Sequence, residues 1–187
     1  MRKTRLTLAT AAALLALAGS AEAATDTTSI QLTGGSLSFT QQPLADDFPA
    51  TALTGVAQTV TAAMNDWKIA DLRGTGTGWN VTFQATQFSD GAGHTLPAGS
   101  LKMLAPATIT PASLNVSVPP LLQGALFTLD NGSAASVAHA LAGTGQGEWL
   151  FDQLNAAVAK DLQLTIPSDA YAGTYTSNLT FTLGTTP

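Results

Sequence analysis

The residues best suited to chemistry lie between Asp71 and Val81, in the stretch Asp-Leu-Arg-Gly-Thr-Gly-Thr-Gly-Trp-Asn-Val. Asp71 and Arg73 are two residues apart, so in an extended strand their side chains share a face and can form a charge-assisted pair. Arg73 is also the only arginine after Arg5. We expect the pair to pin the turn that follows it, with contact to a bound ligand as the alternative role.

Two functional interpretations of this stretch fail on context or spacing. The glycine-rich run 74–78 is followed neither by a lysine nor by a predicted helix, both of which a phosphate-binding loop requires. We expect it to form a flexible hairpin turn instead. Asp66 and Asp71 could be the two carboxylates of a glycosidase. They are an odd number of residues apart in one predicted strand, so their side chains point to opposite faces.

Other catalytic and metal-binding chemistry has few residues to draw on. The chain has two histidines, His94 and His139, and no cysteine, which excludes thiolate chemistry and disfavours a zinc site. No Gly-x-Ser-x-Gly nucleophile motif occurs. Asp46 and Asp47 could supply oxygen ligands to calcium, but a solvated loop is the favoured interpretation. We therefore expect a protein that is not an enzyme and that uses no cofactor.

Aromatic residues offer a second kind of binding chemistry. Tryptophans occur at three positions, Trp67, Trp79 and Trp149. Such rings commonly pack in a core while the indole N–H finds an acceptor. The alternative is an exposed aromatic platform, because the flat face of an indole can stack on the apolar face of a sugar ring. We expect core packing for at least one of the three and keep the platform as the sharper hypothesis for the others.

Residues 1–23 have the features of a secretory signal peptide. A basic start at residues 2–5 precedes an alanine- and leucine-rich run at 6–17, and residues 21–23 form a small-x-small cleavage site. The apolar run is shorter than the roughly 20 residues that a membrane span needs. Removal of these 23 residues from the chain of 187 leaves 164, enough for one domain with its own core. We expect this domain to occupy residues 24–187.

The charge balance narrows the choice of partner. Three of the seven basic residues and one of the twelve acidic residues lie in the signal segment, which leaves four against eleven, a net charge of −7. Nucleic acids and anionic membrane surfaces are bound through Lys and Arg, so both are disfavoured as partners. No later stretch resembles a membrane span. We expect a secreted protein at the cell surface or cell wall.

The apolar periodicity is that of an all-β protein. The clearest run is 79–88, in which Trp79, Val81 and Phe83 alternate with polar residues, and glycine and proline mark turns throughout. We predict a single β-sandwich or barrel-like domain of antiparallel strands. Strands are expected at 29–32, 35–39, 51–62, 67–71, 79–88, 101–104, 114–118, 125–129, 147–151, 162–166 and 174–183. For 51–62 a helix is the less favoured alternative because of its alanines, residues 136–141 are a strand or a helical turn, and 154–159 are a linker.

Two segments of the chain resemble the WxL-domain family of bacterial cell-surface proteins. The first is Asp71-Leu72-Arg73-Gly74 followed by Gly78-Trp79-Asn80-Val81, similar to the family's Asp-x-Arg-Gly and Gly-Trp-x-Leu pattern. The second begins with Trp149-Leu150-Phe151 and continues through Leu162–Pro167 to the C-terminus. The resemblance covers roughly residues 30–187. In both motifs another apolar residue, Val81 or Phe151, replaces the leucine.

The resemblance implies a domain that attaches non-covalently to the cell wall, with peptidoglycan or another cell-wall glycan as the ligand. Other envelope proteins are expected as further partners, and a structural or adhesive envelope subunit is the alternative function. A glycan hydrolase is the least favoured. The ligand-binding residues expected from the motifs are Asp71, Arg73, Trp79, Val81, Trp149 and Phe151.

Overall fold

The computed structural model describes residues 25–114, 117–153 and 161–187. The chain divides into two compact units, residues 1–32 and 33–187. In the described part of the first unit, residues 25–32 form no strand, so the predicted strand at 29–32 is wrong. Ile30 and Leu32 are 83% and 85% exposed there. The expected signal peptide lies outside the described residues and stays a prediction.

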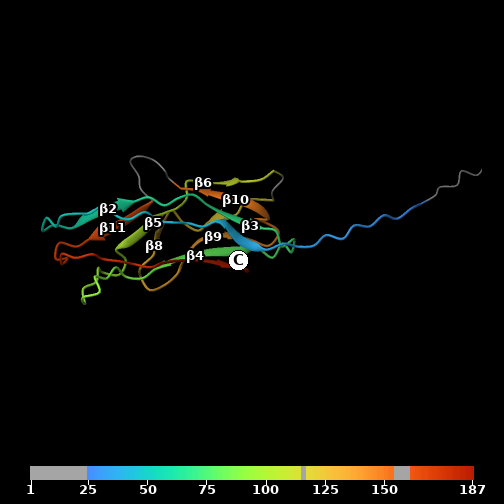
Figure 1. The fold of residues 1–187 in the computed structure, drawn as a ribbon. Helices are drawn as coiled ribbons and strands as arrows, with labels where there is room; N and C mark the ends of the chain where they lie inside the picture. Colours follow the sequence, from blue (N-terminus) through green and yellow to red (C-terminus); the bar gives the residue numbers. More distant parts are fainter. Residues whose placement is uncertain (1–24, 115–116, 154–160) are drawn as a thin grey trace, which may run out of the picture. The chain divides into compact units, whose positions relative to one another are not determined.

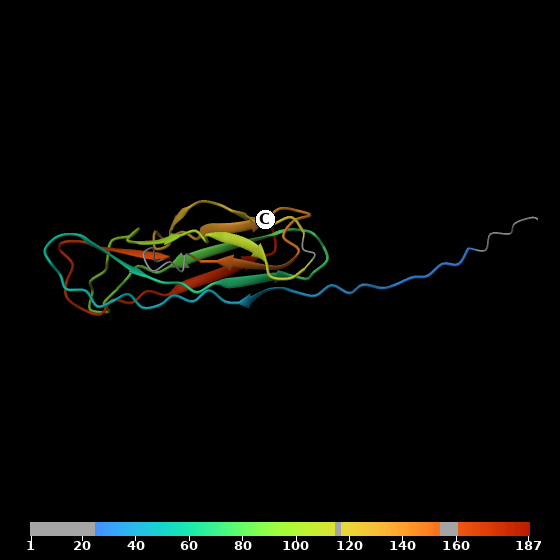
Figure 2. The same ribbon diagram turned by 90° about the horizontal axis from the view of Figure 1, so that it is seen from above.

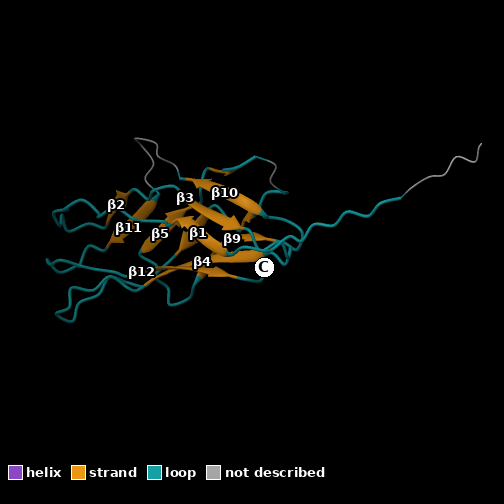
Figure 3. Cartoon of the chain, turned by 45° about the vertical axis from the view of Figure 1, so that its right-hand side comes forward, coloured by secondary structure: helices purple, strands orange, loops and turns teal. Residues whose placement is uncertain are grey.

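Residues 33–187 form an all-β structure, as predicted, and the described residues contain no helix (Figures 1 and 3). Every strand pairing is antiparallel. The strands are β1 (Leu37–Gln41), β2 (Gln58–Ala62), β3 (Trp67–Asp71), β4 (Trp79–Ala85), β5 (Leu101–Leu104), β6 (Thr108–Pro111), β7 (Leu121–Leu122), β8 (Leu126–Thr128), β9 (Ala135–Ala140), β10 (Gly147–Asp152), β11 (Leu162–Ile166) and β12 (Leu179–Gly184).

The strands gather into three sheets of four. The first sheet has the order β1-β3-β10-β6, the second β2-β11-β5-β8 and the third β12-β4-β9-β7. In Figure 2 most strands of residues 33–187 lie along one common axis, and the connecting loops gather at its two ends. Strands that are neighbours in a sheet are mostly distant in sequence, and the two motif tryptophans lie in different sheets, Trp79 on β4 in the third and Trp149 on β10 in the first.

A chain of aromatic rings joins the first and third sheets inside the core. The rings of Trp67 on β3 and Phe151 on β10 stack in parallel, with centroids 3.8 Å apart and an interplanar angle of 4°. Trp79 on β4 meets Phe151 edge-on at 6.4 Å, and Phe83 on the same strand meets Trp67 at 5.5 Å. All four side chains are buried in a single apolar cluster. Alternation along β4 places these rings inward, as the sequence pattern predicted.

Three strands are shorter than the apolar periodicity predicted, because pairing with a partner strand limits their length. The predicted strand at 51–62 is confined to β2, because its partner β11 offers only five residues to pair with. The predicted strand at 174–183 becomes β12, which pairs with the residues of β4. The predicted strand at 79–88 likewise ends at Ala85.

The other predicted strands agree with the structure in some segments and differ from it in others. Residues 67–71, 101–104 and 162–166 are strands with the predicted bounds, and 136–141 is part of a strand, β9, rather than a helical turn. The prediction of a strand at 114–118 is wrong for its described residues, and the expected linker at 154–159 lies outside the described part of the chain. The sequence pattern did not predict β6 or β7, which are short strands next to prolines.

The prolines of residues 94–123 lie mainly where a sheet can accept them. Pro111 ends β6, an edge strand of the first sheet, where a missing N–H interrupts no inner ladder. β5 lies inside the second sheet, between β11 and β8. Pro97 and Pro106 flank β5 without entering it, so its backbone remains able to pair on both sides.

The ring stack predicts unequal costs for two substitutions of Phe151. Phe151→Ala should lower the free energy of unfolding by about 3–5 kcal/mol, because it empties the space between Trp67 and Trp79. Phe151→Leu keeps most of the apolar volume and should cost about 1–2 kcal/mol. Urea unfolding followed by tryptophan fluorescence measures both. Losses below about 1 kcal/mol for both variants would show that ring packing at this position contributes little.

Candidate functional site

Asp71 and Arg73 form the ion pair that their spacing predicted. The Arg73 Nε donates to Asp71 Oδ1 at 2.8 Å, and Arg73 Nη2 donates to Oδ2 at 2.9 Å, so the contact is bidentate. The backbone N–H of Arg73 also donates to Asp71 Oδ1. The Asp71 side chain is only 1% exposed and that of Arg73 16%. Hydrogen bonds to a charged acceptor that is shielded from water are stronger than surface contacts.

The same guanidinium reaches two further segments of the chain. Arg73 Nη2 donates to the Gly78 carbonyl at 2.7 Å, and Nη1 donates to the Thr185 carbonyl at 3.3 Å. Gly78 precedes β4, whereas Thr185 follows β12. Arg73 therefore ties the end of β3 to the start of β4 and to the C-terminal end of β12. The expected role of pinning the turn is confirmed, and the C-terminal contact is an addition that spacing did not predict.

The turn that Arg73 holds is a crossing between sheets, so the prediction of a hairpin at 74–78 is wrong. β3 pairs with β1 and β10 in the first sheet, whereas β4 pairs with β12 and β9 in the third. Residues 72–78, here called the first corner, carry the chain from one sheet to the other. Gly78 has φ of 79°, and a Cβ there would lie 2.3 Å from the Ala140 carbonyl oxygen, so only glycine fits.

A second corner of the same composition lies beside the first. Residues 141–147 carry the chain back from β9 in the third sheet to β10 in the first. The run Gly143-Thr144-Gly145-Gln146-Gly147 repeats the glycine spacing of Gly74–Gly78, and all six glycines have positive φ. The Gly143 N–H donates to the Gly76 carbonyl at 2.8 Å, which joins the two corners directly.

The tryptophans of both motifs support this second corner from within. Trp79 Nε1 donates to the Gly145 carbonyl at 3.0 Å, and Trp149 Nε1 donates to the Gln146 carbonyl at 3.2 Å. A Cβ on Gly145 would lie 2.9 Å from Trp79 Nε1 and 2.3 Å from the Ala140 Cβ, so the backbone lies directly on the indole. Ser117 adds a contact from a third segment, since its Oγ accepts the Gln146 N–H at 2.7 Å.

The three indole rings lie in the core and present no platform to solvent. Trp67 and Trp79 are 0% exposed and Trp149 is 1% exposed, so the core alternative describes all three positions. Val81 and Phe151, which replace the motif leucines, are also fully buried. Of the six predicted ligand-binding residues, only Arg73 has appreciable exposure. Their contribution to ligand binding stays a prediction, and burial restricts it to supporting the corner loops.

The remaining polar residues do not form a second chemical centre among those described. Asp66 accepts the Gln153 N–H through its side chain, away from the Asp71 pair. His94 bonds to Asp90, and His139 bonds to Gln123. Within residues 25–114, 117–153 and 161–187, no three His, Asp or Glu side chains come close enough to hold a metal ion. The described part of the chain also contains no helix that could cross a membrane.

Sequence reasoning missed Gly145, Gln146 and Ser117. The repeated Gly-x-Gly-x-Gly spacing before both tryptophan strands was a usable signal for the second corner. Nothing in the sequence indicates that Ser117 bonds to Gln146, because the two residues lie 29 positions apart.

Comparison with known proteins identifies the family. A family model described as a WxL domain, surface cell wall-binding, matches residues 18–187. The match covers far more than half of the chain, and the protein belongs to this family. It is therefore a secreted, cell-surface protein with a cell-wall-binding domain. No curated protein and no solved structure matches the chain.

The ion pair predicts a pH-dependent stability at the acid end. Hydrogen bonds from Arg73 lower the pKa of Asp71 below its ordinary 3.8, and burial opposes this only in part. A carboxylate with a lowered folded-state pKa stabilises the fold fully above the unfolded value, and the stabilisation is lost as pH falls from about 3.8 toward the lowered pKa.

Asp71→Asn should therefore lose about 2–3 kcal/mol at pH 7, because it removes a charged acceptor from a buried arginine contact. The deficit relative to the wild type should shrink as the pH falls below about 3.8. Urea unfolding from pH 7 to pH 2 measures both effects. Asp169→Asn, at an exposed position, is the matched control and should leave the stability near that of the wild type. A pH-independent deficit would contradict the assignment.

Proposed function

We propose that this domain attaches the protein to the bacterial cell wall by binding peptidoglycan, and that the paired corners of residues 72–78 and 141–147 form the contact surface. The observation that carries the proposal is the convergence of the family motifs. Trp79 and Trp149 come from different sheets, yet both donate to adjacent carbonyls of one corner, and Arg73 holds the other. We infer that the motif residues act on binding through these loops.

The chemistry of the corners suits an uncharged glycan. Thr75 and Thr77 are exposed on the first corner, and their hydroxyls lie 3.2 Å apart. Hydroxyls and free backbone groups of glycine loops can donate to and accept from sugar hydroxyls, and the missing Cβ atoms allow close approach. The acidic balance of the chain works against anionic wall polymers by long-range repulsion. A neutral glycan backbone meets no such barrier.

Each of the six predicted residues has a place in this proposal. Asp71 and Arg73 hold the first corner, and Trp79 and Trp149 hold the second. Val81 and Phe151 pack beneath the tryptophans in the core. The protein then acts by binding alone, without a catalytic step, and other envelope proteins are secondary partners. A structural or adhesive subunit is the alternative, in which the surface interacts with a second protein rather than with glycan.

The experiment compares three tryptophan-to-phenylalanine variants in sedimentation with purified peptidoglycan sacculi. Trp79→Phe and Trp149→Phe each remove one indole donor to a corner carbonyl and should weaken retention about tenfold, the value of one good hydrogen bond. Trp67→Phe is the matched control, because the Trp67 N–H is buried and has no partner among the described residues. It removes the same volume without touching a corner, so retention should persist.

Thr75→Glu tests the surface itself, since it adds a bulky charge to the corner without altering the core, and it should also reduce sedimentation. Urea unfolding confirms that each variant is folded under the assay conditions. Equal retention of all variants would contradict the corner as the contact surface. Absence of wild-type retention would contradict peptidoglycan as the ligand, and self-assembly in that case would favour the structural alternative.

A further inference from the structure

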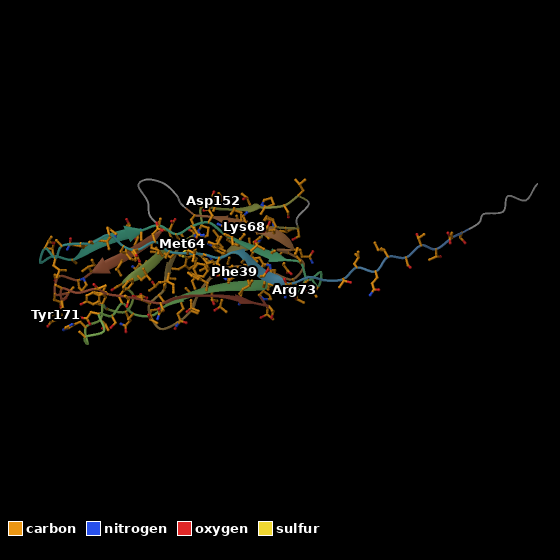
Figure 4. The ribbon with its side chains drawn as sticks, viewed as in Figure 1. Phe39, Met64, Lys68, Arg73, Asp152 and Tyr171 are labelled. Carbon is orange, nitrogen blue, oxygen red and sulfur yellow. The ribbon has the colours of Figure 1, made fainter. Side chains whose placement is uncertain are left out.

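A large groove lies at the end of the 33–187 unit that is remote from the corners. Tyr171 lines this groove, and Figure 4 shows Tyr171 and Arg73 at opposite ends of the unit. The groove has a volume of about 950 Å³ and is lined by the segment 45–53 and the segment 170–177, with strand residues at its base. This volume lies within the range of small-molecule and oligomer binding sites.

The Tyr171 ring is an exposed aromatic surface on the wall of the groove, and its neighbours hold it in place. It is 64% exposed, and one face of its ring stacks on the His94 ring with centroids 4.0 Å apart and an interplanar angle of 19°. The Tyr175 hydroxyl donates to the Tyr171 carbonyl at 3.2 Å, which fixes the backbone that carries the ring. Since one face is covered by His94, the opposite face is available to a ligand.

The His94 ring that supports Tyr171 is itself held in place by Asp90. His94 Nδ1 lies 2.6 Å from Asp90 Oδ2, and the backbone N–H groups of His94 and Ala92 both donate to Asp90 Oδ1. The Asp90 side chain is only 8% exposed, whereas that of His94 is 40% exposed, so the carboxylate is the more enclosed partner of this contact. An exposed ring that is held by a stacked partner loses little conformational freedom on binding, which favours affinity.

The lining of the groove selects a neutral ligand. Its floor is apolar and includes Phe48 and Phe88, whose rings meet edge-on at 6.0 Å. Asp46 and Asp47 are exposed on the rim. Among the residues that the structure describes, no lysine, arginine or histidine lines the groove, so none of them would pair there with a phosphate or carboxylate. The carboxylates can accept hydrogen bonds from hydroxyl and amide N–H groups.

We propose that this groove is a second carbohydrate-binding site and that a neutral, N-acetylated sugar ring stacks on the free face of Tyr171. The acetamido methyl group would meet the apolar floor, and the acetamido N–H and ring hydroxyls would donate to Asp46 and Asp47. The choice of glycan as ligand rests on the proposed wall-binding function, but the site is separate from the corners. One molecule could then engage two glycan segments, which strengthens retention through effective concentration.

The test titrates the mature protein with tetra-N-acetylchitotetraose, a soluble neutral oligomer, by calorimetry. Tyr171→Ala should weaken binding by roughly tenfold, the scale of a good aromatic contact. Tyr171→Phe keeps the ring and should bind within about twofold of the wild type. Trp79→Phe alters the corner only, so the Tyr171-dependent part of the binding should remain. In the wild type, saturation of tyrosine ring protons should transfer to the sugar ring protons, which tests the contact without any substitution.

The outcomes separate this inference from the proposed function. Loss of oligomer binding in Tyr171→Ala together with tyrosine-to-sugar transfer supports the groove, whatever the corner variants do on sacculi. Unchanged binding by Tyr171→Ala, or no tyrosine-to-sugar transfer, overturns it. Sacculus retention without oligomer binding overturns the groove and leaves the corner proposal standing. Capture of an apolar peptide in place of the sugar would likewise overturn it and assign the groove to a protein partner.

Discussion

The hydrogen bonds of the Arg73 guanidinium determine how the first sheet, which contains β3, meets the third sheet, which contains β4 and β12. Arg73 satisfies the buried Asp71 carboxylate and also bonds to carbonyls before β4 and after β12. A carboxylate as enclosed as that of Asp71 requires such a partner, since an unpaired buried charge is costly. The first corner therefore has one arrangement in which every one of these groups is satisfied. The second corner then packs against it through a backbone bond.

The buried positions of Trp79 and Trp149 are better explained by support of the second corner than by direct contact with a ligand. A buried indole has one polar atom, and in Trp79 and Trp149 that atom is used to hold a glycine-rich backbone in place. Glycine loops lose much conformational entropy when they are ordered, so a loop with this composition needs such support. Val81 and Phe151 are both buried apolar residues, which is compatible with this role, and the Phe151 ring also stacks on Trp67.

The two ends of the 33–187 unit differ in chemistry. The corner end presents threonine and backbone groups, whereas the groove end combines apolar side chains with carboxylates and the ring of Tyr171. In the part of the chain that the structure describes, neither surface gathers the lysines or arginines that anionic partners require. The sequence pattern suggested an exposed aromatic platform at the tryptophans, but an exposed ring occurs at Tyr171 instead. It arises in a loop, where periodicity carries no information about exposure.

Local alternation and a two-residue spacing were enough to predict the all-β class, the inward face of β4 and the pairing of Asp71 with Arg73. The strand pairing, the crossing between sheets at Gly78 and the position of His94 under Tyr171 became visible only in the folded chain. These features depend on contacts between residues far apart in the chain. A local pattern shows which side chains must be buried, but the partner that buries them is chosen by packing.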